Sequence, residues 1–489
     1  MTTASGWRNL PPLAGLCSYD DALREGMSVD CCVAWMKRHH YLLVRLHQIF
    51  TARITAEPVY ELKTAFGLHS YLCAEHASAF RQRVGELREP PLGLEVVPHA
   101  GLERLCDEVL CAPSHVELTL GLYECIVPAL VDSLKKYMAA TNLLADAPSV
   151  RVTRFCLLEM EDVAAFGRQA VACLVDENSR ERLAPWLQLL RNCLAEAEGV
   201  SGCDVPIETD ARHSPDEEPA DAPRSLSSKV QPFFSKTPFE YDPVPKRDER
   251  FQDSFNAGVN PEAFLYDERF AARDKTLMMF YKRMREIDVP EMMASILFQT
   301  PGKPWKYYRD MSRQLWDEAR HAMLGEVGFV SLGLDWSRIP INFTWSRNLN
   351  TQLKPWERHA VLFFIEQGLM PRTGKRYEWE VGLASGVPLA GLFQDFDWAD
   401  EVLHAQIGRE WYVKEFGDLN EAMLYGDRCW SQVLSHWRSY LDEGLTEHRN
   451  WWPELYQAAC QKWGINPDPV ALAFDTNYES TRADLKEIR

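Results

Sequence analysis

The chain of 489 residues has no excess of positive charge and no long apolar run. It contains 53 Lys and Arg residues against 71 Asp and Glu residues, which gives a formal net charge of -18. Nucleic acids and anionic membranes bind basic surfaces, so this balance argues against both as general partners. A membrane-spanning helix needs about 20 successive apolar residues, and we expect none in this chain.

Regularly spaced cysteines are also lacking. The 13 Cys residues are an odd number and are scattered, with no C-x-x-C pair and only Cys31 and Cys32 adjacent. The stretch from Met1 to Gly15 is mixed and polar, without the apolar core of a secretory signal. We therefore expect reduced thiols and a cytoplasmic protein.

What the chain does have is apolar residues at helical spacing over most of its length, which predicts an all-α protein. Apolar residues make up 46% of it, with 16 Trp and 22 Phe, enough for more than one core. In the first half, periodicity and breaking Pro and Gly residues predict helices over about 28–57, 60–87, 99–111, 115–141, 150–175 and 179–197.

The second half repeats this pattern after a change in composition. Helices are expected over about 270–299 (interrupted at Pro290), 305–332, 355–370, 397–416, 419–443 and 451–464, with a loop at 333–352 and a partly helical connection at 371–388. The intervening region has few large apolar residues and reads as a flexible linker, whose C-terminal aromatic residues can dock on a domain. The expected organisation is a helical domain at 28–198, a linker at 199–260, a second helical domain at 261–445 and an extension at 446–489.

The two halves can be superposed along the sequence. An offset of 245 residues places His321 on His76, Glu318 on Cys73 and Glu286 on Tyr41. An offset of 242 places Glu366 on Glu124, Glu401 on Glu159 and His404 on Asp162. We interpret this as a tandem duplication of a helical bundle. The first half lacks the full set of acids and histidines, and is either a scaffold that has lost a metal site or a rudimentary site for one ion.

Two Glu-x-x-His motifs carry the chemical signal of the second half. Glu318 and His321 lie in one predicted helix, and Glu401 and His404 lie in another. Residues three apart share a helix face, so each motif directs a carboxylate and an imidazole the same way. Two such motifs with a further Glu from each of two other helices make a carboxylate-rich site for two metal ions.

The two further glutamates come from the remaining helices. Glu366 follows three apolar residues, and a buried carboxylate there is costly unless a metal or a hydrogen bond compensates it. Glu286 and Glu318 are each 16 residues from Gly302, so antiparallel helices would place them at one level. Glu291 is the alternative, since residues 288–291 also resemble a helix start with Pro in the first turn.

Four carboxylates and two neutral imidazoles balance two divalent ions, and such hard ligands suit Fe(II) or Mn(II). Asp395, Asp397 and Asp400 precede Glu401 and act either as helix-start caps, our default, or as hydrogen-bond acceptors for the ligating histidines. Arg320 and Arg409 are candidate partners for these acids.

The residues Glu286 (or Glu291), Glu318-x-x-His321, Glu366 and Glu401-x-x-His404 resemble the ferritin-like superfamily of carboxylate-bridged dinuclear proteins. The resemblance covers about residues 265–420, with a degenerate counterpart over about 30–175. It implies tandem ferritin-like four-helix bundles, the N-terminal one degenerate. It also implies a cofactor of two Fe ions, or Mn and Fe, in an oxidase or oxygenase that acts on a small organic substrate with O2. The electron donor stays open, and a homodimer is compatible with the pattern.

Two functions of other classes remain as alternatives. An iron-handling, ferroxidase-type protein would oxidise Fe(II) without an organic substrate and would offer an acid-lined route to the site. A non-enzymatic helical scaffold would leave the six residues apart and Glu366 exposed.

Overall fold

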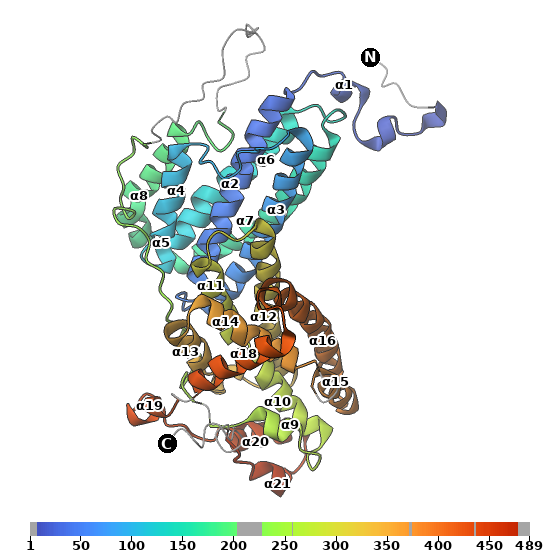
Figure 1. Ribbon diagram of the computed structural model, residues 1–489, viewed down its shortest axis with the longest axis vertical. Helices are drawn as coiled ribbons and strands as arrows, with labels where there is room; N and C mark the ends of the chain where they lie inside the picture. Colours follow the sequence, from blue (N-terminus) through green and yellow to red (C-terminus); the bar gives the residue numbers. More distant parts are fainter. Residues whose placement is uncertain (1–6, 203–226, 257, 371–373, 435–436, 478–489) are drawn as a thin grey trace. The chain divides into compact units, whose positions relative to one another are not determined.

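The computed structural model describes residues 7–202, 227–256, 258–370, 374–434 and 437–477, and these residues form helices and loops without a strand (Figure 1). The chain divides into two compact units, one of Met1–Ile49 with Leu72–Glu240 and one of Phe50–Tyr71 with Tyr241–Arg489. The all-α prediction is confirmed for the described part of the chain. Within that part, every helix is too short or too polar to cross a membrane.

The helices of the first half lie close to their predicted bounds. They are α1 (Tyr19–Ala22), α2 (Val29–Ile54), α3 (Tyr60–Leu87), α4 (Ala100–Leu110), α5 (His115–Leu120), a π-helical turn (Gly121–Ile126), α6 (Val127–Ala140), α7 (Ala147–Leu174) and α8 (Glu177–Glu196). The boundary between the units falls within α2 and α3, whose residues from Phe50 to Tyr71 belong to the second unit.

Residues 203–226 of the expected linker lie outside the described residues, and the segment that follows is anchored to the first unit. The buried carboxylate of Glu108 in α4 accepts hydrogen bonds from the backbone N–H groups of Phe233, Phe234 and Ser235, at 2.8–3.1 Å. It also accepts from the indole N–H of Trp186, at 3.1 Å. The Glu108 carboxylate therefore pairs with three backbone N–H donors of a turn, which would otherwise have no hydrogen-bond partner.

The second unit holds the remaining helices. They are α9 (Pro261–Leu265), α10 (Ala272–Arg285), α11 (Asp288–Gln299), α12 (Trp305–Ser331), α13 (Thr344–Gln352), α14 (Pro355–Gly368), α15 (Lys375–Ala384), α16 (Pro388–Gly408), a π-helical turn (Arg409–Val413), α17 (Lys414–Phe416), α18 (Leu419–Leu434), α19 (Trp437–Asp442), α20 (Trp452–Trp463) and α21 (Pro469–Leu472). Helix α20 and the segment that follows α21 pack on α9, where Phe264 contacts Trp452 and Phe474.

Four helical rods of this unit surround a common interior. The broken rod α10–α11 lies against α12, α12 against α16, α16 against α14, and α14 back against α11. The α10–α12 approach is close because two glycines face α10: a Cβ on Gly325 would lie 2.4 Å from the Met284 backbone nitrogen, and one on Gly328 would lie 2.4 Å from the Phe280 ring. The candidate site lies inside this ring of helices.

Three predictions for this half were wrong in detail. The first rod breaks at Glu286 and Ile287, not at Pro290, which sits in the first turn of α11 where its missing N–H is harmless. Part of the expected loop at 333–352 is the helix α13. Helix α16 begins at Pro388, nine residues before the expected start, and Asp397 and Asp400 are therefore inside the helix and cannot cap it.

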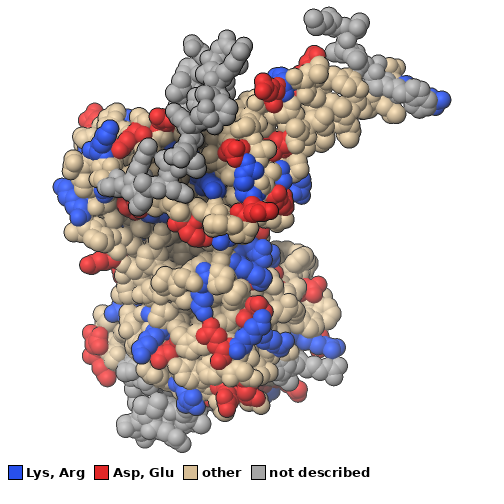
Figure 2. Space-filling model, turned by 45° about the horizontal axis from the view of Figure 1, so that its top comes forward, with Lys and Arg blue, Asp and Glu red and all other residues tan. Residues whose placement is uncertain are grey.

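Acidic and basic side chains are interspersed on the face of the molecule that Figure 2 shows, and neither sign forms a continuous patch on the described residues there. Part of the negative net charge of -18 lies in the interior of the protein, because many acidic residues of the second unit are buried among its helices.

Candidate metal centre

The structure brings together the six residues that the sequence proposes as metal ligands. Glu318 and His321 project from α12, Glu366 from α14, and Glu401 and His404 from α16, and each of these five residues is at most 4% exposed. Glu286 stands at the end of α10, where the helix breaks, with its side chain 15% exposed.

The side chains form two overlapping groups. Ligand atoms of Glu318, Glu366, Glu401 and His404 lie within 4.8 Å of one another, and so do those of Glu286, Glu318 and His321. A third group of the same kind joins His321, Asp397 and Glu401. Glu318, Glu401 and His321 each belong to two of these three groups, so the groups share their members.

Glu318 shows this sharing most directly. Its Oε1 lies 3.1 Å from Nδ1 of His404, and its Oε2 lies 3.7 Å from Nδ1 of His321. The two imidazole ring centres are 5.9 Å apart. The two oxygens of one carboxylate therefore face two different histidines.

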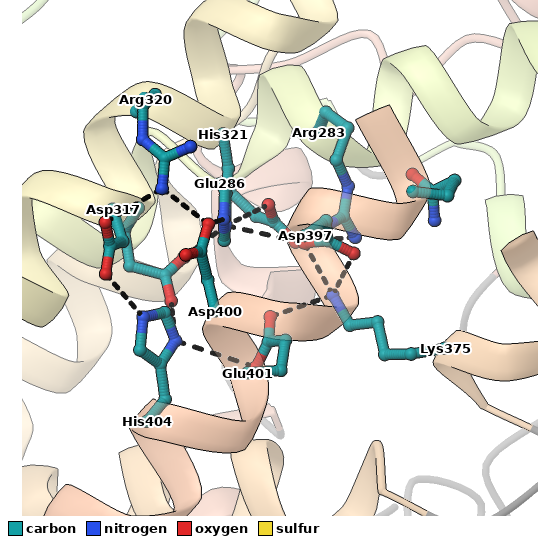
Figure 3. A network of polar contacts seen from close by, with 12 residues as sticks. Arg283, Glu286, Asp317, Arg320, His321, Lys375, Asp397, Asp400, Glu401 and His404 are labelled. Atoms are coloured by element: carbon teal, nitrogen blue, oxygen red, sulfur yellow. Dashed lines mark hydrogen bonds and ion pairs between the residues drawn. The ribbon is translucent and has the colours of Figure 1, made fainter. Parts of the chain in front are cut away.

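The far nitrogen of each histidine is held by an aspartate of the opposite motif. Nε2 of His321 is 3.1 Å from Asp400 in α16, and Nε2 of His404 is 3.4 Å from Asp317 in α12 (Figure 3). An imidazole that donates Nε2–H to a carboxylate presents its Nδ1 lone pair to a metal and is fixed in orientation. Each Asp-Glu-x-x-His segment thus supplies a glutamate and a histidine that face inward. Its aspartate orients the histidine of the other segment.

Arginines hold the orienting aspartates. Asp317 pairs with Arg313 at 2.9 Å and with Arg320 at 2.8 Å, and Arg320 also bridges to Asp400. Arg320 is therefore a partner of these acids, whereas Arg409 donates to Gln367, at 2.8 Å. Asp395 is exposed. Our default assignment of Asp400 as a helix cap was wrong, because the residue lies in mid-helix and hydrogen-bonds His321.

Two buried cations complete the site and were missed by the sequence analysis. Nζ of Lys375, in the first turn of α15, lies 2.8 Å from both Asp397 and Glu401, and the Lys375 side chain is fully buried. Arg283 of α10 pairs with Asp397 on the other side, and its Nη2 is 2.8 Å from Glu286. No sequence motif marks either residue, since both come from segments that read as ordinary helix or connection.

Buried charge shifts the pKa values of the inward-facing groups. Burial disfavours a charged His321, but the neighbouring carboxylates of Asp400, Glu286 and Glu318 outweigh this effect and raise its pKa to about 10. The pKa of His404 is likewise raised by Asp317, Glu318 and further carboxylates against the effect of burial. Burial, reinforced by the like charge of Glu401, raises the pKa of Glu366 well above its ordinary value.

Glu291, the alternative first ligand, lies in a different network. It pairs with Lys63 and Arg247 and accepts a hydrogen bond from Ser346 at 2.8 Å. Helix α11 does begin at Asp288, the condition under which Glu291 was expected to replace Glu286. Glu291 points to these cations instead, while Glu286 reaches His321 from the break before the helix, with its Oε2 3.4 Å from Nδ1 of that histidine.

The donor set fits divalent metal ions. Nδ1 of His321, Nδ1 of His404, Oε2 of Glu286 and Oε2 of Glu401 are buried and have no hydrogen-bond partner among the described residues. Buried polar atoms are rarely left in this state, and these four belong to the proposed ligands. Oxygen-rich coordination with one imidazole for each ion matches Fe(II) or Mn(II) better than thiolate-bound Zn or Cu(I).

The sequence offsets also point to residues of the first unit. His76, the counterpart of His321, lies 2.6 Å from Glu159, the counterpart of Glu401. The counterparts of Glu318 and Glu286 are the buried residues Cys73 and Tyr41. Within the described residues, every group of three or more candidate ligands belongs to the second unit.

A cavity of about 300 Å³ within the second unit reaches the proposed ligands, with Glu286, Glu318, Glu366 and Glu401 in its wall. Much of the rest of the wall is apolar, including Met292, Leu349 and Ile365.

The chain was compared with the models of known protein families, with curated proteins and with solved structures, and none of them matches it.

Proposed function

We propose that the second unit is a ferritin-like bundle with a dinuclear centre of iron, or of manganese and iron, that oxidises a small organic substrate with O2. The observation that carries the proposal is Glu318, whose two oxygens face Nδ1 of two histidines fixed from behind by aspartates. A solvated helix face would not bury four glutamates and two histidines around one carboxylate.

Glu286, Glu318 and His321 would hold one ion, and Glu318, Glu366, Glu401 and His404 the other. Bound Fe or Mn would supply the capacity to react with O2, which no amino-acid side chain has. The chain's own residues would orient the ligands. Asp400 and Asp317 set the tautomers of the two histidines, and Arg320 forms ion pairs with both aspartates.

The burial of the site favours an enzyme over a scaffold. Glu366 is 4% exposed, whereas a scaffold with surface acids would leave it in water. The cavity favours an organic substrate over iron handling, because its wall combines charged residues with apolar ones such as Met292, Leu349 and Ile365, which can contact an organic molecule but cannot bind a hydrated metal ion.

We further propose that the first unit is the degenerate copy of this bundle. The matching helix order and the paired His76 and Glu159 support a common origin. The replacement of two of the counterpart positions by Cys73 and Tyr41 supports loss of the metal, so the whole chain is expected to hold two ions.

The proposal is tested by metal content. Protein purified without chelator and loaded anaerobically with Fe(II) or Mn(II) is expected to hold about two ions per chain by plasma mass spectrometry. A Glu318→Gln/Glu401→Gln variant, which keeps side-chain size, is expected to lose both. The exposed Glu421→Ala substitution in α18 is the control and should retain both ions.

Helicity measured by circular dichroism shows whether the variants fold. Loss of metal with unchanged helicity assigns the ions to the site, and O2 consumption by the reduced, loaded protein is then expected. A wild-type protein that folds but takes up neither metal would refute the dinuclear site.

A further inference from the structure

The cavity beside the proposed centre is lined by both apolar and charged residues. Trp345 of α13 and Trp430 of α18 stack at 4.4 Å between ring centres, with their planes 19° apart, and both line the cavity. Val289, Met292 and Ile365 extend the same apolar wall. The cavity's volume of about 300 Å³ lies at the lower end of the range for small-molecule sites, which matches a small molecule with an apolar body.

Besides the four proposed ligand glutamates, the charged residues that line the cavity are Glu262 of α9, Lys282 and Arg285 of α10, and Asp288 of α11. Both cations already have carboxylate partners. Lys282 pairs with Glu378, and Nη2 of Arg285 lies 2.6 Å from Oε1 of Glu262. Neither cation is therefore available to bind an anionic ligand.

The carboxylates, by contrast, keep unused hydrogen-bond acceptors. Oδ1 of Asp288 accepts from Arg247 at 2.6 Å and from Ser346 at 2.9 Å, whereas its Oδ2 is buried without a hydrogen-bond partner among the described residues. Oε2 of Glu262 is in the same state. Buried carboxylate oxygens are costly to leave unpaired, and only a hydrogen-bond donor can satisfy them.

We propose that the substrate of this site is a small, largely apolar amine, whose ammonium group is bound by Glu262 and Asp288 and whose body lies against Trp345 and Trp430. The inference rests on the proposed function, because it treats the cavity that reaches the four glutamates as the substrate site. It narrows the substrate class from an organic molecule in general to a cationic amphiphile, and it excludes carboxylic acids of the same shape.

The test uses three molecules that share one apolar body: 2-phenylethylamine, 2-phenylethanol and 3-phenylpropanoate. Binding is measured by isothermal titration calorimetry with metal-free protein and with protein loaded with Mn(II). The amine is expected to bind at least about 10-fold more tightly than the alcohol and the carboxylate, since only the ammonium offers a charged hydrogen-bond donor to the two carboxylates. Mn(II) should also broaden the amine's NMR lines, which places it beside the metal.

Variants identify the groups responsible. Asp288→Asn and Glu262→Gln are each expected to weaken amine binding about 10-fold and to leave 2-phenylethanol unchanged. Trp345→Ala should weaken all three ligands. The matched control is Asp335→Asn, an exposed acid outside this cavity, which should change nothing.

The two proposals fail in different ways. Amine binding without metal uptake would refute the dinuclear centre and leave the amine site in place. Metal uptake with equal affinity for the three ligands, with a preference for the carboxylate, or with no binding at millimolar concentration would overturn the amine proposal. So would an amine preference that survives in both the Asp288→Asn and the Glu262→Gln variant.

Discussion

Each half of the centre depends on the aspartate that precedes the glutamate of the other motif. Asp317 lies next to Glu318 in sequence but holds His404, and Asp400 lies next to Glu401 but holds His321. The segments Asp317–His321 and Asp400–His404 share the pattern Asp-Glu-x-x-His. This shared pattern is the signal by which the sequence marks Asp317, a residue that a search for ligands alone passes over.

Asp317 and Asp400, each of which orients the histidine of the other motif, are expected to determine the affinity for metal. Asp400→Asn keeps the shape of the side chain but weakens its hold on His321, and loss of such an orienting carboxylate typically lowers metal affinity about 10- to 100-fold. Competitive titration with a chelator measures the change. Asp395→Asn, an exposed aspartate on the same helix, is the control, and equal affinity in the two variants would show that Asp400 does not orient a ligand.

Lys375 is expected to stabilise the metal-free protein. Its ammonium is the nearest cation to Glu401, and its removal leaves that carboxylate and part of Asp397 buried without compensation. Breaking a buried ion pair from one side costs about 3–5 kcal/mol. Lys375→Met should therefore lower the melting temperature of the metal-free protein. Added Mn(II) should raise the melting temperature of the variant by more than it raises that of the wild type.

The exposed Lys414→Met substitution is the control for Lys375, because its partner Glu410 lies in water and little free energy is involved. A Lys375→Met protein as stable as the wild type without metal would show that the lysine does not balance these carboxylates.

At the scale of helices, sequence periodicity predicted most elements but not the breaks that place the site. Helix α12 matches its expected bounds within a residue, because Pro304 and Gly333 delimit it. The break at Glu286 was foreseen only through the alternative in which residues 288–291 start a helix, and Pro290 does lie in the first turn of that helix, α11. Lys375 shows the same limit: its burial depends on where α15 packs, which a local pattern does not report.

The close approach of α10 to α12 is expected to be necessary for the first ion. A Cβ on Gly325 would meet backbone atoms of α10, 2.4 Å from the Met284 nitrogen and 2.6 Å from the Phe280 oxygen. Gly325→Ala must therefore push α10 outward, at a cost typical of overpacking, about 1–3 kcal/mol. Glu286 follows the end of α10 directly, so occupancy by metal should fall towards one ion per chain.

Gly368→Ala in α14 provides the contrast. No atom lies within 4 Å of a Cβ at this glycine, and alanine favours the helix, so stability should rise or stay the same. Thermal unfolding and metal content of the two variants test the pair. Equal behaviour of Gly325→Ala and Gly368→Ala would mean that the α10–α12 spacing does not position Glu286.

At the scale of the whole molecule, the two halves use similar helices for different interiors. The second unit buries charge, with Arg283, Lys375 and the glutamates inside, whereas the first buries neutral histidines and thiols. His39 is fully buried, and its Nε2 lies 2.7 Å from the Ser133 hydroxyl. Burial lowers the pKa of His39 to about 3 and, elsewhere in this unit, that of His47 to about 4.

These histidines are expected to make the protein unstable in mild acid. In the unfolded chain His39 binds a proton below about pH 6.5, but in the folded protein it stays neutral until about pH 3. The stability it contributes is complete above pH 6.5 and is lost as the pH falls, at about 1.4 kcal/mol per pH unit. In His39→Gln, whose amide can still bond Ser133, the fall in unfolding free energy between pH 7.5 and pH 5.0 should be about 2 kcal/mol smaller than in the wild type. Urea unfolding at the two pH values measures this difference. The carboxylates titrate equally in both proteins and therefore cancel in the comparison. Equal losses of unfolding free energy in the two proteins would show that His39 is already protonated, or accessible to water, in the folded state.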